Sequence, residues 1–264
     1  MKPANLDALS AVRRLALLGL LLATSCARFP GTDGGASRFP RISFRIQTRG
    51  AIDSRPRLGN QYYVAIRTIR DASVPNEGAP VQVSEGAAGA GNGFVAGKPT
   101  HFIRFDPSVS AQFPYRLNRF ILNPENPDDP NNLINYVDIS NGRGQIVIFT
   151  VPGDDTNPNE LSFDLFLNQL ADSDAAANEI RYLQVNILTM NVAANGANDN
   201  VRSWDALGNS RFGSPDVITY LNVDTRSNRI FDNQSRIEPT DDVQGGSPDP
   251  SLDIQSFSVE VRQP

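Results

Sequence analysis

Residues that favour turns occur throughout the chain after its first 26 residues, and they limit what it can fold into. Of the 264 residues, 24 are Asn, 22 are Asp, 20 are Gly and 19 are Pro, together 85. These residues stabilise turns or interrupt regular structure. Two good helix formers are scarce, with only 2 Lys and 7 Glu. This balance argues against a helical bundle or a coiled coil and predicts short strands joined by many turns.

Apolar residues alternate with polar ones, as in strands that bury one face. Ile42, Phe44 and Ile46 alternate with polar residues, which is the period of a half-buried strand. Further strands are expected at 61–69, 80–83, 100–105, 115–122, 133–139, 145–151, 161–167, 180–189, 217–221 and 252–261. We therefore predict an all-β fold, an antiparallel β-sandwich or a jelly-roll-like domain, in a single domain over 41–264. Its long irregular loops are expected at 84–99, 123–132, 191–215 and 223–250.

Three local patterns make finer predictions. Asn141-Gly142 lies between two apolar runs, and this dipeptide favours a tight turn, so a hairpin is expected over 133–151. In the last strand the apolar residues change parity, which predicts a β-bulge near Gln255. Residues 171–178 have room for one helical turn.

The amino terminus has the features of an export signal. Lys2, Arg13 and Arg14 precede an apolar run at 15–23. A run of that length is too short to cross a bilayer, which needs about 20 residues. It matches the apolar region of a secretory signal peptide.

The end of this leader resembles a bacterial lipoprotein signal. Ala23-Thr24-Ser25-Cys26 matches the small residues and the cysteine of a lipobox, although the family prefers Leu where Ala23 stands. The resemblance implies that 1–25 is a signal peptide and that Cys26 is lipidated and becomes the new amino terminus. Residues 26–40 then comprise the lipidated cysteine and a flexible tether. The expected location is an exported, membrane-anchored lipoprotein, in the outer membrane, on its periplasmic face or at the cell surface.

Several classes of function are disfavoured by what the chain lacks. The only histidine is His101, and no G-x-S-x-G motif accompanies it, which argues against a Ser-His-Asp hydrolase and against zinc. The glycine-rich stretch 86–98 does not have phosphate-loop spacing, so no nucleotide is expected. The net charge of −5, without basic clusters, argues against nucleic acid. We therefore expect no enzyme activity.

Acidic loops are the candidates for a metal site. Asp128 and Asp129 form one group, and Asp154 and Asp155 form another. Further groups are 198–200 and 241–242. Calcium prefers carboxylate, amide and carbonyl oxygens on loops, but Asp and Asn are equally common in turns. Both a structural calcium ion and plain turn chemistry stay open, and no other cofactor is expected.

Trp204, the only tryptophan, is the candidate ligand-binding residue because it lies among polar residues. It is expected either to stack on a sugar or partner, or to cover the edge of the core. The function expected is a noncatalytic binding or interaction module, attached to the membrane through its lipid, that binds an envelope protein or a glycan. The alternatives are a secreted hydrolase that uses paired carboxylates and a purely structural surface protein.

Overall fold

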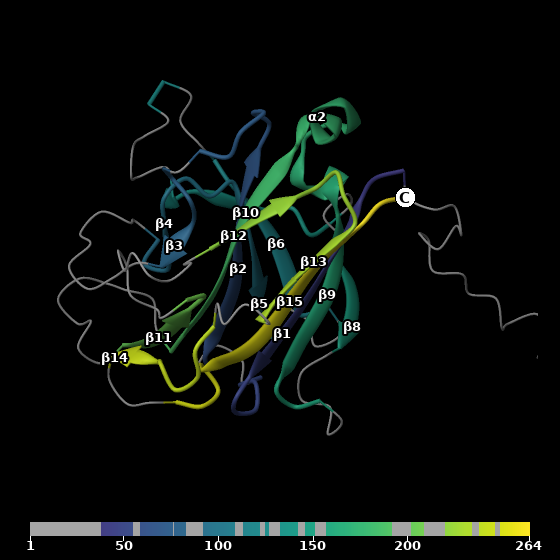
Figure 1. Ribbon diagram of the computed structural model, residues 1–264. Coiled ribbons are helices and arrows are strands. Elements are labelled where there is room, and N and C mark those ends of the chain that lie inside the picture. The colour runs from purple at the N-terminus through teal and green to yellow at the C-terminus, as the bar shows by residue number, and fades with distance from the viewer. Residues whose placement is uncertain are drawn as a thin grey trace, which may run out of the picture. The chain divides into compact units, whose positions relative to one another are not determined.

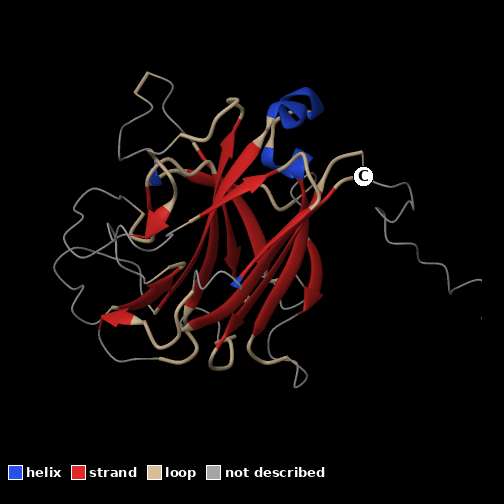
Figure 2. Cartoon of the chain, viewed as in Figure 1, coloured by secondary structure: helices blue, strands red, loops and turns tan. Residues whose placement is uncertain are grey.

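The computed structural model is an all-β domain, which confirms the predicted fold class (Figures 1 and 2). It describes residues 38–54, 59–75, 77–82, 92–108, 113–121, 125–126, 133–141, 146–150, 157–191, 202–208, 220–233, 238–245 and 249–264. These residues belong to one compact unit, Ser37–Pro264. Among them no helix has the length and apolar character needed to span a membrane.

Two antiparallel sheets make up the sandwich. The five-stranded sheet has the order β13 (Arg229–Asp232), β15 (Ile254–Arg262), β1 (Arg41–Thr48), β9 (Glu160–Phe166) and β8 (Val147–Thr150). The eight-stranded sheet has the order β14 (Gln244–Gly245), β11 (Ser203–Ala206), β10 (Tyr182–Met190), β2 (Gln61–Ile69), β5 (His101–Phe105), β6 (Tyr115–Phe120) and β7 (Tyr136–Asp138), and β12 (Leu221–Asp224) also pairs with β10. The short strands β3 (Val81–Gln82) and β4 (Val95–Ala96) pair with each other.

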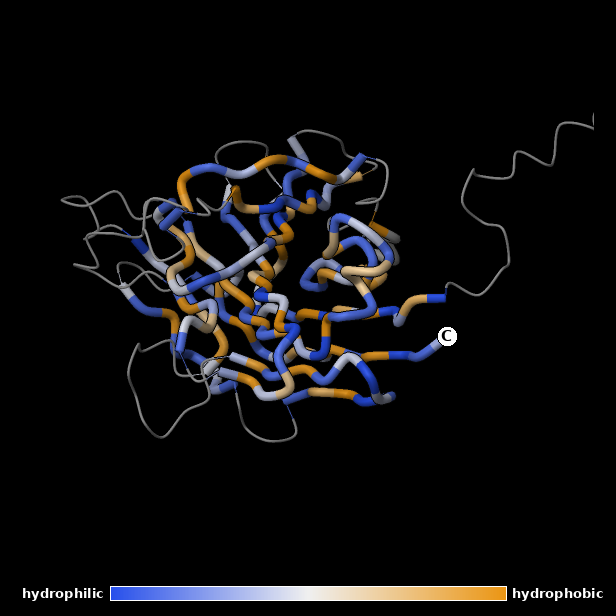
Figure 3. The backbone as a smooth tube through the Cα atoms, turned by 90° about the horizontal axis from the view of Figure 1, so that it is seen from above, coloured by the Kyte–Doolittle hydropathy of each residue, from blue (hydrophilic) through white to orange (hydrophobic). Residues whose placement is uncertain are grey.

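The main core lies between the two sheets. Alternate residues of β1, β9 and β15 face alternate residues of β2, β6 and β10, and all of them are buried. Tyr115 of the eight-stranded sheet contacts Phe163 of the five-stranded sheet, with ring centroids 4.8 Å apart, and Phe163 stacks on Phe44 at 5.1 Å. In Figure 3 hydrophobic and hydrophilic residues follow one another along the chain, as expected for strands that bury one face.

A second apolar cluster covers the other face of the eight-stranded sheet. It contains Tyr63, Phe94, Phe102, Phe120 and Trp204 with their neighbours, and Tyr63 stacks on Phe94 with centroids 4.4 Å apart. The consecutive residues Tyr62 and Tyr63 are therefore both buried, one on each face of β2. This sheet is a middle layer along part of its width, which explains why β2 and β10 contain no exposed residue.

Polar side chains hold the covering segment in place on the same face. Gln184 and Asn186 of β10 are buried, and their amide groups donate to the carbonyl oxygens of Pro75 (3.1 Å) and Pro80 (3.0 Å). Buried amides need such partners, because an unsatisfied donor in the interior costs about 1–3 kcal/mol.

The structure tests the finer sequence predictions. The bulge is confirmed, because Gln47 pairs with Ser256 and Thr48 with Ile254, leaving Gln255 without a partner in β1. The helical turn is confirmed as α2 (Asp174–Glu179), which follows the 3-10 turn η3 (Leu167–Leu170) and is capped by Ser173.

The predicted hairpin at 133–151 is wrong. β7 pairs with β6 in the eight-stranded sheet, whereas β8 pairs with β9 in the five-stranded sheet. Ser140 extends the pairing of β7, since its hydroxyl accepts the Leu117 backbone N–H at 2.8 Å. β7 and β8 therefore lie in different sheets and do not pair with each other.

Candidate functional site

Three carboxylates converge beside β11. Asp205 lies in this strand, and Glu238 and Asp242 lie in the segment between β13 and β14. One side-chain oxygen from each lies within 4.8 Å of the other two, and no other such group of His, Cys, Asp or Glu occurs among the described residues. Asp205 and Glu238 are buried and Asp242 is half-buried.

Asp205 is held by backbone donors on both sides. Its Oδ1 accepts the N–H of Ala206 at 2.8 Å, and its Oδ2 accepts the N–H of Ile254 at 2.7 Å. The second bond ties β11 of one sheet to the start of β15 in the other. Strand alternation directs Asp205 away from the face on which Trp204 packs.

Hydrogen bonds hold Glu238 at its backbone and at one of its carboxylate oxygens. Asn233 binds the Glu238 main chain, accepting from its N–H at 2.8 Å and donating to its C=O at 3.2 Å. Glu238 Oε2 accepts the N–H of Gly208 at 3.0 Å. Its Oε1 accepts no hydrogen bond from any described residue. Water does not reach this oxygen either, because it is buried and Glu238 is only 4% exposed.

Burial and neighbouring charge make this site unfavourable for another anion. Burial, together with the charges of Asp205 and Asp242, raises the pKa of the Glu238 carboxyl to about 11, against the opposing hydrogen bond from Gly208. A buried carboxylate is stabilised by a proton or by a cation. The cluster is therefore suited to hold a positive charge.

An ion pair network lies beside the cluster. Arg49 binds Asp253 through Nε at 2.6 Å and Asp241 through Nη1 at 2.7 Å, and Asp253 is fully buried. The backbone N–H of Asp241 donates to both oxygens of Asp253, at 3.2 Å each. These contacts fix the segment that carries Asp242 against the start of β15.

The cluster does not have the geometry of a glycosidase pair. The catalytic carboxyls of glycosidases stand about 5–9.5 Å apart with a sugar between them. Here the oxygens lie within 4.8 Å, and Asp205 is 0% and Glu238 4% exposed. A polysaccharide cannot enter such a space, whereas a bare ion can.

The structure describes only some of the residues that the sequence indicated as candidate ligands. Cys26 and the calcium candidates Asp128, Asp129, Asp154 and Asp155 lie outside the described residues. Of the further acidic groups, 241–242 supplies Asp242 to the cluster. Asp205 and Glu238 were not among the predicted metal ligands. Neither belongs to an acidic run, so no local signal marks them.

Trp204 lies in strand β11, not in a loop as the sequence indicated. It is 7% exposed and belongs to the second apolar cluster. The guanidinium of Arg202 lies 5.9 Å from its ring centroid. This position matches the second expectation for Trp204, a side chain that covers the edge of the core.

His101 is a buried strand residue. It is buried in β5, and its Nδ1 lies 2.9 Å from Thr100 Oγ1. Burial, with a smaller contribution from the charge of Arg119, lowers the pKa of His101 to about 3. The ring therefore stays neutral in the folded protein.

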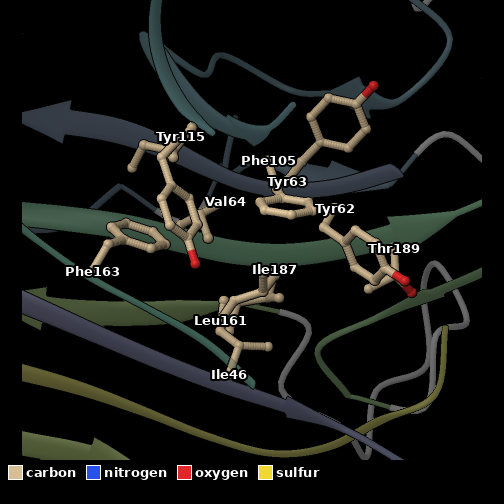
Figure 4. A pocket seen from close by; sticks show the side chains of 11 residues that line it. Ile46, Tyr62, Tyr63, Val64, Phe105, Tyr115, Leu161, Phe163, Ile187 and Thr189 are labelled. Atoms are coloured by element: carbon tan, nitrogen blue, oxygen red, sulfur yellow. The ribbon is translucent and has the colours of Figure 1, made fainter. Parts of the chain in front are cut away.

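A small cavity lies between the sheets (Figure 4). Its lining is mostly apolar and includes Ile187 and the tyrosines Tyr62, Tyr63 and Tyr115. The volume of the cavity is about 10 Å³. That is about the space for one water molecule. This cavity is too small for an organic ligand.

The β7 edge of the eight-stranded sheet exposes several apolar side chains. β7 is the last strand in the order of described strands, and its three residues are all exposed. Tyr136 is 43% and Val137 39% exposed, and the adjacent residues Ile121 and Ile134 are 55% and 48% exposed. Sheet edges are usually protected by charge, proline or a covering segment, so an apolar edge is a candidate interaction surface.

Comparison with known proteins gives no relative from which a role could be transferred, since no family model, curated protein or solved structure matches this chain.

Proposed function

We propose that the chain is an exported, lipid-anchored, noncatalytic interaction module of the cell envelope that binds an extended segment of a partner protein along β7. The leader and Cys26 support the location, because the basic start, the short apolar run and the lipobox-like end occur in the right order. The apolar edge formed by Ile121, Ile134, Tyr136 and Val137 supports the binding and is the observation that carries it.

The backbone of β7 supports strand addition as the binding mode. The N–H of Ile121 donates to the C=O of Asn135 at 2.8 Å, and that of Ile139 donates to Leu117 at 2.9 Å. Odd-numbered residues of this segment therefore bond to β6. In an antiparallel ladder the residues between them, Tyr136 and Asp138, direct their N–H and C=O groups to the other side. An extended peptide can bond to these groups and place apolar side chains beside Val137.

Site-specific photocrosslinking in cells tests the proposed surface. A benzophenone amino acid at Val137 is expected to yield one discrete crosslinked protein. The control position is Ile230 of β13, the edge of the other sheet, which is 57% exposed and is expected to yield none. Val137→Lys, in a chain that carries the crosslinker at Ile134, should abolish the product because a charge blocks edge pairing.

Two results would contradict the proposed binding. One is equal labelling from Val137 and Ile230, which would mark nonspecific contact. The other is glycan binding by the purified chain without any protein crosslink. The anchor is tested separately: Cys26→Ala should move the protein from the membrane fraction, and mass spectrometry should detect the lipid only on Cys26.

A further inference from the structure

We propose that Asp205, Glu238 and Asp242 bind one calcium ion that fastens the segment between β13 and β14 to strand β11. Two observations carry this inference. One is the convergence of the three carboxylates, whose oxygens lie within 4.8 Å of one another. The other is Glu238 Oε1, a buried acceptor that receives no hydrogen bond from the described residues.

The spacing fits a single coordination sphere. Calcium–oxygen distances are about 2.3–2.6 Å, so two oxygens on one ion are separated by at most about 5 Å. The three oxygens meet this limit as a set. Each carboxylate also has a second oxygen, and calcium accepts carboxylates as monodentate or bidentate ligands.

The hydrogen bonds already present leave oxygens of the cluster oriented for an ion. Glu238 uses Oε2 to accept from Gly208, which leaves Oε1 for the cluster. Asp205 receives one backbone bond from Ala206 of its own strand and one from Ile254 of β15, and these fix the orientation of the carboxylate. Such partners typically orient the ligands of a metal ion and are part of the site.

The donor set selects the type of ion. The ligands are carboxylates alone, which suit hard cations such as calcium or magnesium. Zinc sites usually contain His or Cys, and the chain's only histidine lies in β5. Magnesium usually keeps several waters. With Asp205 at 0% and Glu238 at 4% exposed, the site has little room for them, which favours calcium.

The structural effect of the ion follows from where its ligands lie. β14 pairs with β11 through only two residue pairs, Ser203 with Gly245 and Trp204 with Gln244. An ion shared by Asp205, Glu238 and Asp242 adds a second connection between this segment and β11. Calcium binding is therefore expected to stabilise the folded state by mass action.

Titration of the full chain, purified in detergent and treated with EDTA, tests the site. Calcium chloride should bind at one site by calorimetry and should raise the unfolding temperature more than magnesium chloride does at the same concentration. Terbium should give sensitised emission on excitation of Trp204, because this single tryptophan directly precedes Asp205. Calcium should displace the terbium signal.

A matched pair of variants locates the site. Glu238→Gln keeps the size of the side chain and an oxygen for Gly208, and it should weaken calcium binding on the order of tenfold or more. Glu179→Gln is the control, because Glu179 is exposed, lies in α2 and is outside the cluster. It should bind calcium as the wild type does.

Several results would overturn the proposal. These are no heat and no change in unfolding temperature with calcium, or calcium binding by Glu238→Gln equal to that of the wild type. Circular dichroism checks that the variants fold. If Glu238→Gln does not fold, Asp242→Asn replaces it, with the same loss of terbium emission expected.

Discussion

At the scale of single residues, burial fixes the protonation state of the only histidine. His101 has a pKa of about 3 in the folded protein, below its ordinary value of 6.5, because burial and Arg119 disfavour the charged ring. Between these two values the unfolded chain binds a proton that the folded chain does not. The contribution of His101 to stability is therefore complete above about pH 6.5 and is lost as the pH falls toward 3.

The pH dependence of unfolding should show this effect. We expect the free energy of unfolding to lose about 1.4 kcal/mol per pH unit below the unfolded pKa on account of His101. His101→Asn retains a polar atom near Nδ1 for Thr100 but does not titrate, so its pH profile should be flatter. Urea unfolding at about pH 7 and about pH 5.5 measures both slopes. Equal slopes in the two proteins would contradict the assignment.

Only one of the three carboxylates in the candidate metal site could be predicted from the sequence. Asp242 was among the acidic groups noted in the sequence, because Asp241 lies next to it. Asp205 and Glu238 gave no signal, because their partners lie far away in the chain. Glu238 meets Gly208 across 30 residues and Asp205 meets Ile254 across 49. Proximity of this kind is set by the sheet order, which the local pattern does not contain.

At the scale of elements, the long amphipathic strands were all predictable, whereas several of the short ones were not. β1, β2, β9, β10 and β15 contain seven to nine residues each, and all of them were expected from alternation or from apolar runs. β4 and β14 have two residues each, too few to show a period. β11 and β13 fall in regions rich in turn residues and were expected to be loops. The 133–151 hairpin was wrong because Asn-Gly identifies a turn but not the sheet that each flanking strand joins.

The bulge in β15 predicts how this strand tolerates deletions. Gln255 has no partner in β1. Ile254 and Phe257 are an odd number of positions apart in sequence, yet both are buried on the core face because the bulge lies between them. Deleting Gln255 removes the bulge and leaves Ile254 and Phe257 two positions apart, which keeps both on the core face. We expect this deletion to fold with a loss of about 1–2 kcal/mol, partly from the lost Asn233 contact to the Gln255 carbonyl.

Deleting Ser258 is the matched comparison. Ser258 pairs with Arg45 in β1 and with Asp232 in β13, inside the regular part of the ladder. Its removal places Val259 and Val261 on the wrong face relative to Phe257. We expect no folded protein, as measured by circular dichroism during heating. Equal stability of the two deletion variants would show that the bulge does not set the register.

At the scale of the whole molecule, stability comes from layered apolar packing without a disulfide, since Cys26 is the only cysteine. The main core joins the two sheets, and the second cluster adds a cover on the outer face of the larger sheet. The predicted sandwich is confirmed, but the second cluster was not foreseen. Its members include Phe94 from a glycine-rich segment and Trp204 from an expected loop. Their burial depends on segments that only the folded molecule brings over the sheet.

The start of the folded domain gives a final prediction. The sequence placed it at residue 41, but Phe39 is 4% exposed and packs in the main core, and the C=O of Pro40 accepts the N–H of Leu167 at 2.9 Å. A chain that starts at 41 lacks this ring, and loss of a buried Phe costs about 3–5 kcal/mol. We therefore expect it to be less stable in urea than a chain that starts at 37. Phe39→Ala in the longer chain should reproduce most of the difference. Equal stability of the two chains would place Phe39 in the tether after all.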